Sequence, residues 1–541
     1  MKISAAEALL KVIEEHGVDV LFGYPGAANT PIYDNIGKTG IRYILTRNEQ
    51  GAAHAASSYF KMTGKVGVCT ATSGPGATNL VTGIANAYMD STPLVAITGQ
   101  VIRSQVGKDA FQEVDMTGVT SPISKHNYLV KHAEDIPRIV NEAFYIAGTG
   151  RPGPVVIDIP MDLQKELIEY KPLGKPEIRG YHPDIETDVK QVAKMAKAVK
   201  KAKRPLMIAG GGILAAGASE AFTRLVETVR IPVVSTLMGI GSIPSAHRQY
   251  LGMIGSHGFK SANLAFAKAD LVIFMGARVS DRAVADTAGL SGRATVIHVD
   301  IDPAEISKNV PCDISVIGNI RDVLAHLERE WNGYCCPADW LEEAAGLKQY
   351  NPEVKGGEGE YVNPKYFLRM LSEATEGDAV IATEVGQNQI WTSNNYAFKK
   401  PNTFLTSGGF GTMGYGLPAA MGAKIAKPDA LVIAIEGDGS FQMSMPELGA
   451  IKQWGVNVKI VVFVNHSLGM VHEYQKVNYG GNYVSVDLGQ YPRFGKIADA
   501  YDIPNLTIHK NSEVSGAIEK LLETEDTFLL EVAVDPAETT L

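Results

Sequence analysis

The sequence has few cysteines and no long apolar run, and both features narrow the class of protein. Its 541 residues hold four cysteines, of which two are adjacent and none shows a C-x-x-C spacing. A disulfide framework or a zinc site is therefore not expected, and a reducing, cytoplasmic location fits this pattern. No uninterrupted apolar run reaches the roughly 18 residues that indicate a membrane span.

Basic residues are also in the minority. The chain has 50 Lys and Arg against 59 Asp and Glu, a formal net charge of −9. This balance argues against nucleic acid or an anionic membrane as a partner. Residues 1–19 place Lys11, Glu14 and Glu15 between apolar residues at helical spacing. We expect an amphipathic helix there, and neither a signal peptide nor a transit peptide.

Glycine, by contrast, is abundant, with 55 residues, which indicates many close turns of the backbone. A chain of this length is too long for one core and predicts three domains. Two polar stretches, residues 165–190 and 333–361, are expected to be linkers. The expected domains are therefore residues 1–165, 190–330 and 360–535.

Short apolar runs alternate with helical patterns in each domain, which is typical of an α/β fold. The expected strands are residues 20–24, 43–46, 66–70, 94–98 and 155–159 in the first domain, 205–209, 232–236, 271–275 and 295–300 in the second, and 431–435 and 458–464 in the third. We therefore expect the α/β class, with three doubly wound parallel-sheet domains.

The most informative stretch is residues 431–470 in the third domain. One expected strand ends at Gly437-Asp438-Gly439-Ser440 and the next ends at Asn465, 27 residues beyond Asp438. Both strand ends lie on the edge of a doubly wound sheet where ligands bind. Carboxylate and amide oxygens there suit a Mg²⁺ ion that holds a diphosphate. A tight turn without a ligand is the alternative for GDGS alone, but the second strand ending in Asn disfavours it.

A weak internal repeat links the first and third domains. Residues 72–79 and 406–413 both place a glycine-rich turn after a strand and before a helix of small residues. The two domains are therefore expected to share a fold, although glycine-rich turns also resemble one another by chance.

GDGSF followed after this gap by Asn resembles the diphosphate–Mg²⁺ motif of thiamine-diphosphate enzymes. The surrounding residues most resemble the catalytic subunit of acetohydroxyacid synthase, also called acetolactate synthase, over nearly the whole chain. The resemblance implies a first domain that binds the pyrimidine of thiamine diphosphate, a central FAD-binding-like domain, and a third domain that binds the diphosphate and Mg²⁺.

The resemblance implies a transferase that decarboxylates pyruvate and joins the remaining two-carbon unit to a second 2-oxo acid. The products would be acetolactate or acetohydroxybutyrate, on the route to the branched-chain amino acids. A related decarboxylase, acyl transferase or C–C hydrolase with another substrate is the alternative. A catalytically inactive flavoprotein or regulatory binder is a third possibility, disfavoured by the intact Glu49, Asp438 and Asn465.

Glu49 lies in Arg47-Asn48-Glu49-Gln50-Gly51-Ala52-Ala53-His54, where a strand passes into a helix. A Glu in the first turn of a helix is commonly there because the helix dipole favours it. In the family that this motif resembles, the glutamate shares a proton with N1′ of the aminopyrimidine ring. That contact lets the cofactor act as its own base, with the protein supplying the carboxyl group and the geometry.

The resemblance assigns a further set of residues to thiamine diphosphate and Mg²⁺. Met413 would be the apolar wedge that bends the cofactor, and Asn388 stands where the family usually has His. The expected cofactor-binding residues are Glu49, Thr72, Pro75, Asn79, Val385, Gly386, Gln387, Asn388, Gly411, Met413, Gly437, Asp438, Gly439, Ser440, Asn465, Leu468, Gly469 and Met470, with Asp438, Asn465 and Ser467 as the metal ligands.

The expected substrate end combines matches with departures. Gly26, Phe111 and Gln112 correspond to the pocket of the family and are grouped with Glu49 as catalytic. Tyr474 replaces the Trp of the pattern V-x-Q-W-Q, and Met161 replaces a Lys, both near the substrate channel. The sequence also ends soon after residues 534–536, without the tail that covers the site in many relatives. We expect a weak preference for 2-oxobutyrate over pyruvate as acceptor.

The central domain resembles the FAD-binding series of the family. Its candidate FAD residues are Arg151, Gly210, Gly211, Gly212, Thr236, Leu237, Met238, Gly255, His257, Gly276, Arg278, Arg282, Asp300 and Ile301. An acid at a strand end, Asp300, suits a ribose or adenine. In this family the flavin is largely structural, so FAD is expected to bind without redox chemistry.

Assembly is also implied by the resemblance. Glu49 and the pair Asp438 and Asn465 lie on different domains, which meet across two chains in the family. We expect a homodimer or homotetramer with active sites at the interface, and the sequence leaves open a regulatory subunit.

Overall fold

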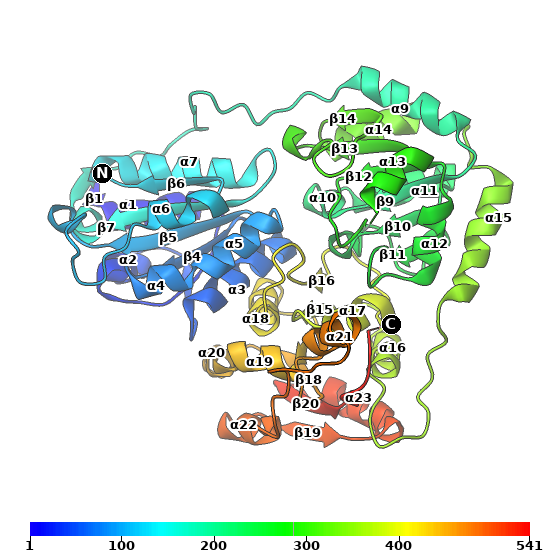
Figure 1. Cartoon of the computed structure of the whole chain (residues 1–541). Coiled ribbons are helices and arrows are strands. Elements are labelled where there is room, and N and C mark those ends of the chain that lie inside the picture. The colour runs from blue at the N-terminus through cyan, green and yellow to red at the C-terminus, as the bar shows by residue number, and fades with distance from the viewer. Residues whose placement is uncertain (285, 541) are drawn as a thin grey trace.

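The computed structural model describes residues 1–284 and 286–540. Three six-stranded sheets organise the chain, and every strand pair within them is parallel. The expected α/β class with three parallel-sheet domains is confirmed. Figure 1 shows the first unit in blue and cyan, the second in green, and the third from yellow to red.

The first sheet has the order β3-β2-β4-β5-β7-β6. Its strands are β2 (Val20–Gly23), β3 (Arg42–Leu45), β4 (Gly67–Ala71), β5 (Leu94–Gln100), β6 (His126–Leu129) and β7 (Pro154–Pro160). Its helices are α1 (Ala5–Glu15), α2 (Thr30–Ile36), α3 (Glu49–Thr63), α4 (Pro75–Asn79), α5 (Val81–Met89), α6 (Met116–Thr120), α7 (Ile136–Gly148) and α8 (Met161–Lys165).

The middle sheet has the order β11-β10-β9-β12-β13-β14. Its strands are β9 (Pro205–Ala209), β10 (Val233–Ser235), β11 (Tyr250–Met253), β12 (Leu271–Met275), β13 (Thr295–Asp300) and β14 (Ile314–Ile317). Its helices are α9 (Val189–Lys201), α10 (Gly211–Ala215), α11 (Ser219–Val229), α12 (Lys260–Lys268), α13 (Thr287–Arg293), α14 (Ile320–Glu330) and α15 (Ala338–Gly346).

The third sheet has the order β16-β15-β17-β18-β20-β19. Its strands are β15 (Val380–Thr383), β16 (Phe404–Leu405), β17 (Val432–Gly437), β18 (Lys459–Val464), β19 (Asn505–Ile508) and β20 (Phe528–Ala533). Its helices are α16 (Pro364–Ala374), α17 (Gln387–Asn395), α18 (Gly416–Ala426), α19 (Asp438–Ser444), α20 (Leu448–Trp454), α21 (Gly469–Asn478), α22 (Phe494–Ala500) and α23 (Val514–Glu523).

The first and third sheets have the same topology. Numbered from the first strand of each unit, both orders read 2-1-3-4-6-5, whereas the middle sheet reads 3-2-1-4-5-6. The weak repeat in the sequence thus corresponds to a shared fold, as expected. The middle order is that of the dinucleotide-binding fold.

Two sequence expectations need correction. The first residues form strand β1 (Lys2–Ser4), which pairs antiparallel with β8 (Leu167–Glu169), before helix α1 begins. The stretch 333–361 is not only a linker, because it contains α15. Trp340 of α15 is buried and its indole N–H donates to the carbonyl of Pro205 at 2.9 Å. This helix therefore packs onto the middle sheet.

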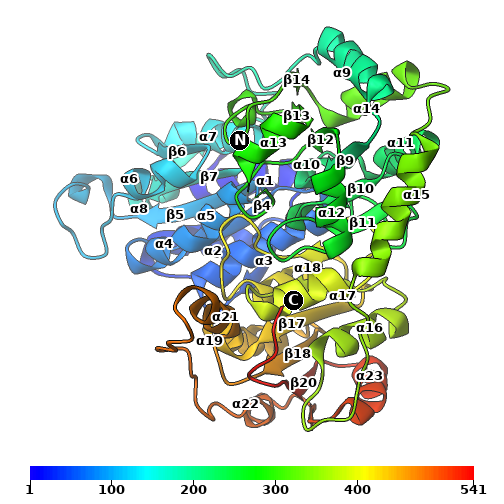
Figure 2. The ribbon, with the colours of Figure 1, turned by 45° about the vertical axis from the view of Figure 1, so that its right-hand side comes forward.

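Helices α3 and α18 join the first and third units face to face (Figure 2). Both are rich in small residues. An ideal Cβ on Gly422 of α18 would lie 2.2 Å from the carbonyl oxygen of Ala55 of α3. The two helices therefore approach one another more closely than larger side chains would permit, and the two units share one core. No helix in the described part of the chain is long and apolar enough to cross a membrane.

Candidate functional site

The predicted cofactor residues gather where the strand order reverses. In the first sheet this switch point lies between β2 and β4, and in the third sheet between β15 and β17. Ligands of doubly wound sheets bind in the crevice at such points. An ideal Cβ on Gly26, after β2, would lie 2.5 Å from Cβ of Thr72, after β4. Glycine therefore allows the two loops of the first sheet to meet.

Glu49 begins helix α3 at the edge of the first sheet. Asn48 caps the helix by accepting the backbone N–H of Gln50 at 2.8 Å. The Glu49 side chain is buried, and its Oε2 accepts a hydrogen bond from Asn79 Nδ2 at 2.9 Å. An ideal Cβ on Gly76 would lie 3.1 Å from Glu49 Oε1. The structure thus brings Glu49 together with the turn that contains Thr72, Pro75 and Asn79.

A second buried acid, Glu447, holds the backbone that leads to Glu49. Its Oε1 accepts the N–H groups of Arg47 and Asn48, each at 2.9 Å. Burial raises the pKa of the Glu447 carboxyl to about 7, although the N–H groups of Arg47 and Asn48 lower it. No local pattern indicated this contact, because Glu447 lies 400 residues from Arg47 along the chain.

Asp438 is the first residue of α19, directly after β17. Its Oδ2 accepts the backbone N–H groups of Asn465 at 3.1 Å and His466 at 2.6 Å, and its Oδ1 accepts that of Gly439 at 2.9 Å. Burial raises the pKa of Asp438 to about 7, although these N–H groups lower it. Among the described residues no basic side chain donates to this buried carboxylate, which is therefore suited to a metal cation.

Asn465 follows β18 and lies beside Asp438. Its Nδ2 donates to Gln387 Oε1 at 2.9 Å, and its Oδ1 accepts the N–H of Ser467 at 3.0 Å. The carbonyl of Ser467 accepts the N–H of Gly469 at 2.9 Å. Within residues 1–284 and 286–540, no three His, Cys, Asp or Glu side chains cluster to hold a metal. A metal here would therefore use one carboxylate with amide and carbonyl oxygens, a set that fits Mg²⁺.

The loop after β15, with Val385, carries the remaining diphosphate candidates. Asn388 Nδ2 donates to the carbonyl of Ile435 at 2.9 Å, so the Asn that replaces the usual His is bound to strand β17. Gly386 has φ of 153° and Gly437 lies close to Asn388, with 3.4 Å between an ideal Cβ and Asn388 Oδ1. The structure therefore joins this loop to the Asp438 turn.

Close contacts continue into the loop before α21. An ideal Cβ on Gly439 would lie 2.8 Å from Cδ2 of Leu468 and 3.9 Å from Cε of Met413. Ser440 Oγ donates to the carbonyl of Gly437 at 3.2 Å. Gly469 and Met470 are the first residues of α21. The predicted residues of the third domain thus form one contiguous edge.

Met413 also lines a cavity between the first and third units. The cavity measures about 360 Å³, and its walls are Gln50, Thr82, Phe410, Gly411, Thr412, Met413 and Met443. Its lining is mostly apolar, as expected around an aromatic cofactor ring.

Two further buried acids lie beneath this edge and were not predicted. Glu384 accepts the N–H groups of Gly414, Tyr415 and Gly416 at 2.7, 3.1 and 3.0 Å. Glu436 is fully buried, and neither oxygen of its carboxyl group has a hydrogen-bond partner among the described residues. Burial, together with Glu384, raises the pKa of Glu436 well above its usual value. In the sequence, the only local indication of this pair was Glu436 itself, an acid at the end of an otherwise apolar run directly before GDGS.

The residues expected at the substrate end lie farther apart in the fold than the expected cofactor-binding residues, and two of them are exposed. Phe111 is 88% exposed and Tyr474 on α21 is 57% exposed. The backbone of Gln112 packs on Gly74, whose ideal Cβ would lie 2.8 Å from the Gln112 carbonyl oxygen. Met161 begins α8. A single chain therefore leaves Phe111 and Tyr474 largely without packing partners.

The candidate FAD residues of the middle domain follow five strands. They lie in the loops after β9 (Gly210, Gly211, Gly212), β10 (Thr236, Leu237, Met238), β11 (Gly255, His257) and β12 (Gly276, Arg278, Arg282), and at the end of β13 (Asp300, Ile301). An ideal Cβ on Gly210 would lie 2.2 Å from the Gly276 carbonyl oxygen. The glycines therefore let the two turns at the switch point of this sheet meet, as dinucleotide-binding folds require.

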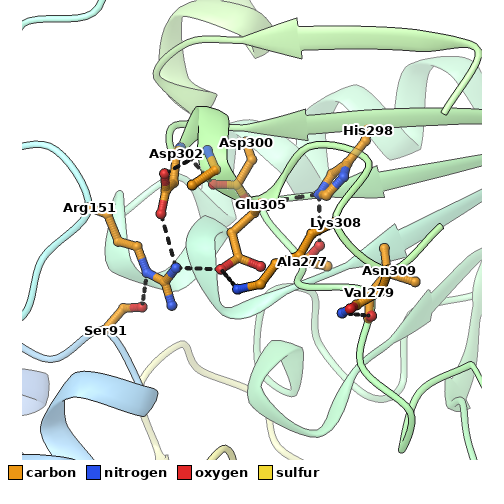
Figure 3. Close-up of polar contacts among 11 residues, drawn as sticks. Ser91, Arg151, Ala277, Val279, His298, Asp300, Asp302, Glu305, Lys308 and Asn309 are labelled. Atoms are coloured by element: carbon orange, nitrogen blue, oxygen red, sulfur yellow. Dashed lines mark hydrogen bonds and ion pairs between the residues drawn. The ribbon is translucent and has the colours of Figure 1, made fainter. Parts of the chain in front are cut away.

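Arg151 reaches this edge from the first unit (Figure 3). Its Nη1 donates to Asp302 at 3.0 Å and to Glu305 at 2.7 Å, and its Nε donates to Ser91 at 2.9 Å. Asp300 Oδ1 accepts the N–H of Asp302 at 2.9 Å, and burial raises the pKa of Asp300. The structure thus joins Arg151 to the loop that carries Asp300. A largely buried acid at a strand end and glycine turns at the switch point fit an adenine dinucleotide.

Known proteins match along most of the chain. The N-terminal TPP binding domain of thiamine pyrophosphate enzymes matches residues 3–119, the central domain matches 192–327, and the C-terminal TPP binding domain matches 384–532. The acetolactate synthase large subunit of Lactococcus lactis is 41% identical, covering 99% of this chain and 93% of that protein. The acetolactate synthase of Arthrospira platensis is 43% identical, covering 98% and 94%.

A third relative is the acetolactate synthase large subunit IlvB1 of Mycobacterium tuberculosis, which is 42% identical over 97% of this chain and 87% of its own length. The three domain matches follow the three sheets in order, and the relatives extend through all of them. This chain belongs to the thiamine pyrophosphate enzymes, in the family of acetolactate synthase large subunits.

Proposed function

We propose that this chain is the catalytic subunit of a Mg²⁺-dependent carboligase that acts on pyruvate. Two pyruvates and one proton give acetolactate and CO₂, and 2-oxobutyrate as acceptor gives acetohydroxybutyrate. The observation that carries the proposal is that one chain supplies two different switch points. One holds a buried acid, Glu49, and the other a carboxylate and amide edge, Asp438 and Asn465.

The residues at the carboxyl edge of the third sheet, here called the metal edge, would bind the cofactor and orient it. Thiamine diphosphate, when bound, supplies the carbon nucleophile for the keto group of pyruvate and holds the electron pair left when CO₂ departs. Asp438, Asn465 and the carbonyl of Ser467 would hold Mg²⁺ on the diphosphate. Gly437 and Gly439 leave room for backbone N–H groups to approach the diphosphate at the start of α19. Gln387 and Asn388 fix this edge through their hydrogen bonds to Asn465 and Ile435.

Glu49 holds a proton at the pyrimidine ring. Its burial and its hydrogen bond from Asn79 keep the carboxyl group in one place. A carboxyl group fixed in this way shares a proton with a ring nitrogen at hydrogen-bond distance. Met413, in the wall of the 360 Å³ cavity, would pack between the two rings of the cofactor.

FAD would bind along the carboxyl edge of the middle sheet in a structural role. The strand order of that sheet, its glycine turns and Asp300 support this proposal. Arg151 would contact the dinucleotide while remaining bound to Asp302 and Glu305 (Figure 3). No reaction step uses the flavin.

Assembly would complete the site. The exposed Phe111 of the first unit and the exposed α21 of the third, with Tyr474 and Val477, are large apolar groups that a monomer leaves in water. A homodimer, alone or paired into a tetramer, would place the first unit of one chain against the third unit of the other. Since two of the relatives are described as large subunits, a small regulatory subunit is a further proposed partner.

A second candidate function rests on the substrate end. Tyr474 and Met161 stand where the family pattern has Trp and Lys, so another 2-oxo acid or acceptor is the competing substrate. This candidate is a related thiamine-diphosphate decarboxylase, acyl transferase or C–C hydrolase.

Product identification tests the proposal. The protein is incubated with pyruvate, thiamine diphosphate and Mg²⁺, with and without FAD, and the products are identified by mass spectrometry. Acetolactate and CO₂ in equal amounts are expected. Acetaldehyde with no acetolactate would favour the second candidate, and the Asp438→Ala variant serves as the inactive control.

A further inference from the structure

A chain of hydrogen bonds runs from residue 540 to the proposed metal ligand Asn465. Thr540 donates to Glu473 on α21, from its N–H at 2.7 Å and from its Oγ1 at 2.8 Å. Gln387 Nε2 donates to Glu473 Oε1 at 2.5 Å, and Asn465 Nδ2 donates to Gln387 Oε1 at 2.9 Å. Hydrogen bonds are therefore donated toward Glu473 from both sides, by Thr540 on one side and by Asn465 through Gln387 on the other.

The direction of this chain decides which atom of Asn465 is available to a metal. A side-chain amide can present either its oxygen or its NH₂ group, but a carboxylate only accepts hydrogen bonds. Glu473 therefore requires Gln387 to present Nε2, and the carbonyl of Glu538 accepts from the same nitrogen at 2.8 Å. Gln387 Oε1 is then left for Asn465 Nδ2. As a result Asn465 Oδ1, the atom that can bind a cation, faces away from Gln387.

Both ends of this chain of contacts are buried, whereas Glu473 is half-buried and helix α21 is mostly exposed. Gln387 and Thr540 are each 5% exposed and Asn465 is 7% exposed. In α21 only Gly469 is buried, so apolar packing does little to fix the helix. An ideal Cβ on Gly469 would lie 1.9 Å from Gln387 Oε1, which means that glycine is needed for Gln387 to reach Asn465. The polar contacts of Glu473 therefore place α21 against the metal edge.

We infer that Glu473 is a positioning residue that fixes, through Gln387, the side-chain oxygen of Asn465 for Mg²⁺. The inference rests on the proposed function, because it takes Asp438 and Asn465 as the Mg²⁺ site. The family pattern V-x-Q-W-Q has Gln at this position, and its amide oxygen also accepts hydrogen bonds. Groups that orient a metal ligand typically affect metal affinity by about 10–100-fold.

The test is the affinity for Mg²⁺, measured by calorimetric titration of MgCl₂ into the full chain saturated with thiamine diphosphate. Glu473→Met keeps the length of the side chain and removes both acceptors, so the Kd for Mg²⁺ should rise about tenfold. Glu473→Gln keeps one acceptor and should restore the Kd to within about threefold of the wild type.

The matched control is Glu519→Met, which changes an exposed Glu on helix α23, outside this network. It should bind Mg²⁺ as the wild type does. Wild-type affinity in a folded Glu473→Met variant overturns the inference and leaves the proposed function intact, whereas a wild type that binds no Mg²⁺ overturns both. Glu473→Ala carries the same expectation if the Met variant does not fold.

Discussion

The first and third sheets have the same strand order, yet their switch points carry different chemistry. After the strands of the first sheet lie a buried acid, Glu49, and the turn with Thr72 and Asn79. At the corresponding edge of the third sheet lie Asp438 and Asn465, oxygen ligands suited to a metal. The fold is thus a common scaffold, and the loops after its strands decide whether a unit handles protons or binds a metal.

The largest expected effect comes from the third sheet. Asp438→Ala removes the proposed metal carboxylate, so the affinity for thiamine diphosphate in the presence of Mg²⁺ should fall by more than about 100-fold. Calorimetric titration of the cofactor, with and without Mg²⁺, measures this loss. A loss of less than tenfold would contradict the assignment of Asp438 as the metal ligand.

The first sheet should respond in the opposite way. Glu49→Gln keeps the size of the side chain and the contact with Asn79 but cannot share the ring proton in the same manner. Cofactor binding should change by less than about threefold, while kcat falls by more than about tenfold, or at least ~1.4 kcal/mol of barrier. If cofactor binding and kcat fall together, the assignment of proton handling to the first sheet and cofactor binding to the third is wrong.

The preference for one acceptor over another tests the role of the third unit, through Tyr474 on α21. Tyr474→Trp restores the aromatic of the family pattern, and one methylene of contact discriminates by about 1–3 kcal/mol. The ratio of acetohydroxybutyrate to acetolactate, with pyruvate and 2-oxobutyrate in competition, should therefore rise by roughly tenfold or more. Tyr350→Trp, a half-exposed Tyr of the middle unit, should leave the ratio unchanged. A wild type that already strongly favours acetohydroxybutyrate would refute the role of Tyr474.

The smallest expected effect concerns the joint between the two units. The pKa of Glu447 in the folded chain is raised to about 7 by burial, above the value of about 4.3 in an unfolded chain. Between these values the folded state binds more protons, so the free energy of unfolding falls as the pH rises from about 4.5 to 7. Glu447→Gln should reduce this fall by about 1–2 kcal/mol. Denaturant unfolding at pH 5 and pH 7.5 measures it, and an unchanged difference would contradict the raised pKa.

Local patterns predicted much of the fold, and long-range contacts account for what they missed. The strands at residues 205–209, 271–275 and 295–300 were predicted with the bounds that the structure has. The first two are continuous apolar runs, and the third has three β-branched apolar residues, Val296, Ile297 and Val299. Strand β6 was missed, since His126 and Asn127 interrupt its apolar pattern. Helix α15 was missed because it is short and lies in a stretch rich in charged residues and glycine, and because the burial of its Trp340 depends on the middle sheet.

The same distinction applies to the site. The spacing of Asp438 and Asn465 predicted that these residues meet, and the backbone of Asn465 does donate to Asp438. Nothing local indicated that Glu447 holds the residues before Glu49, or that Glu473 contacts Gln387 across 86 residues of sequence. Buried acids are costly unless they have partners, and those partners lie on other elements.

The close contact between α3 and α18 at Gly422 means that these two helices tolerate substitution less well than the exposed helix α21. At Gly422 any side chain would enter the backbone of Ala55, so variants there are lost to misfolding before their activity is tested. On α21, Val471, Tyr474 and Val477 are all exposed, and substitutions cost little core packing. A mutant library selected for a new acceptor should therefore accumulate its changes on α21, while α3 and α18 remain as they are.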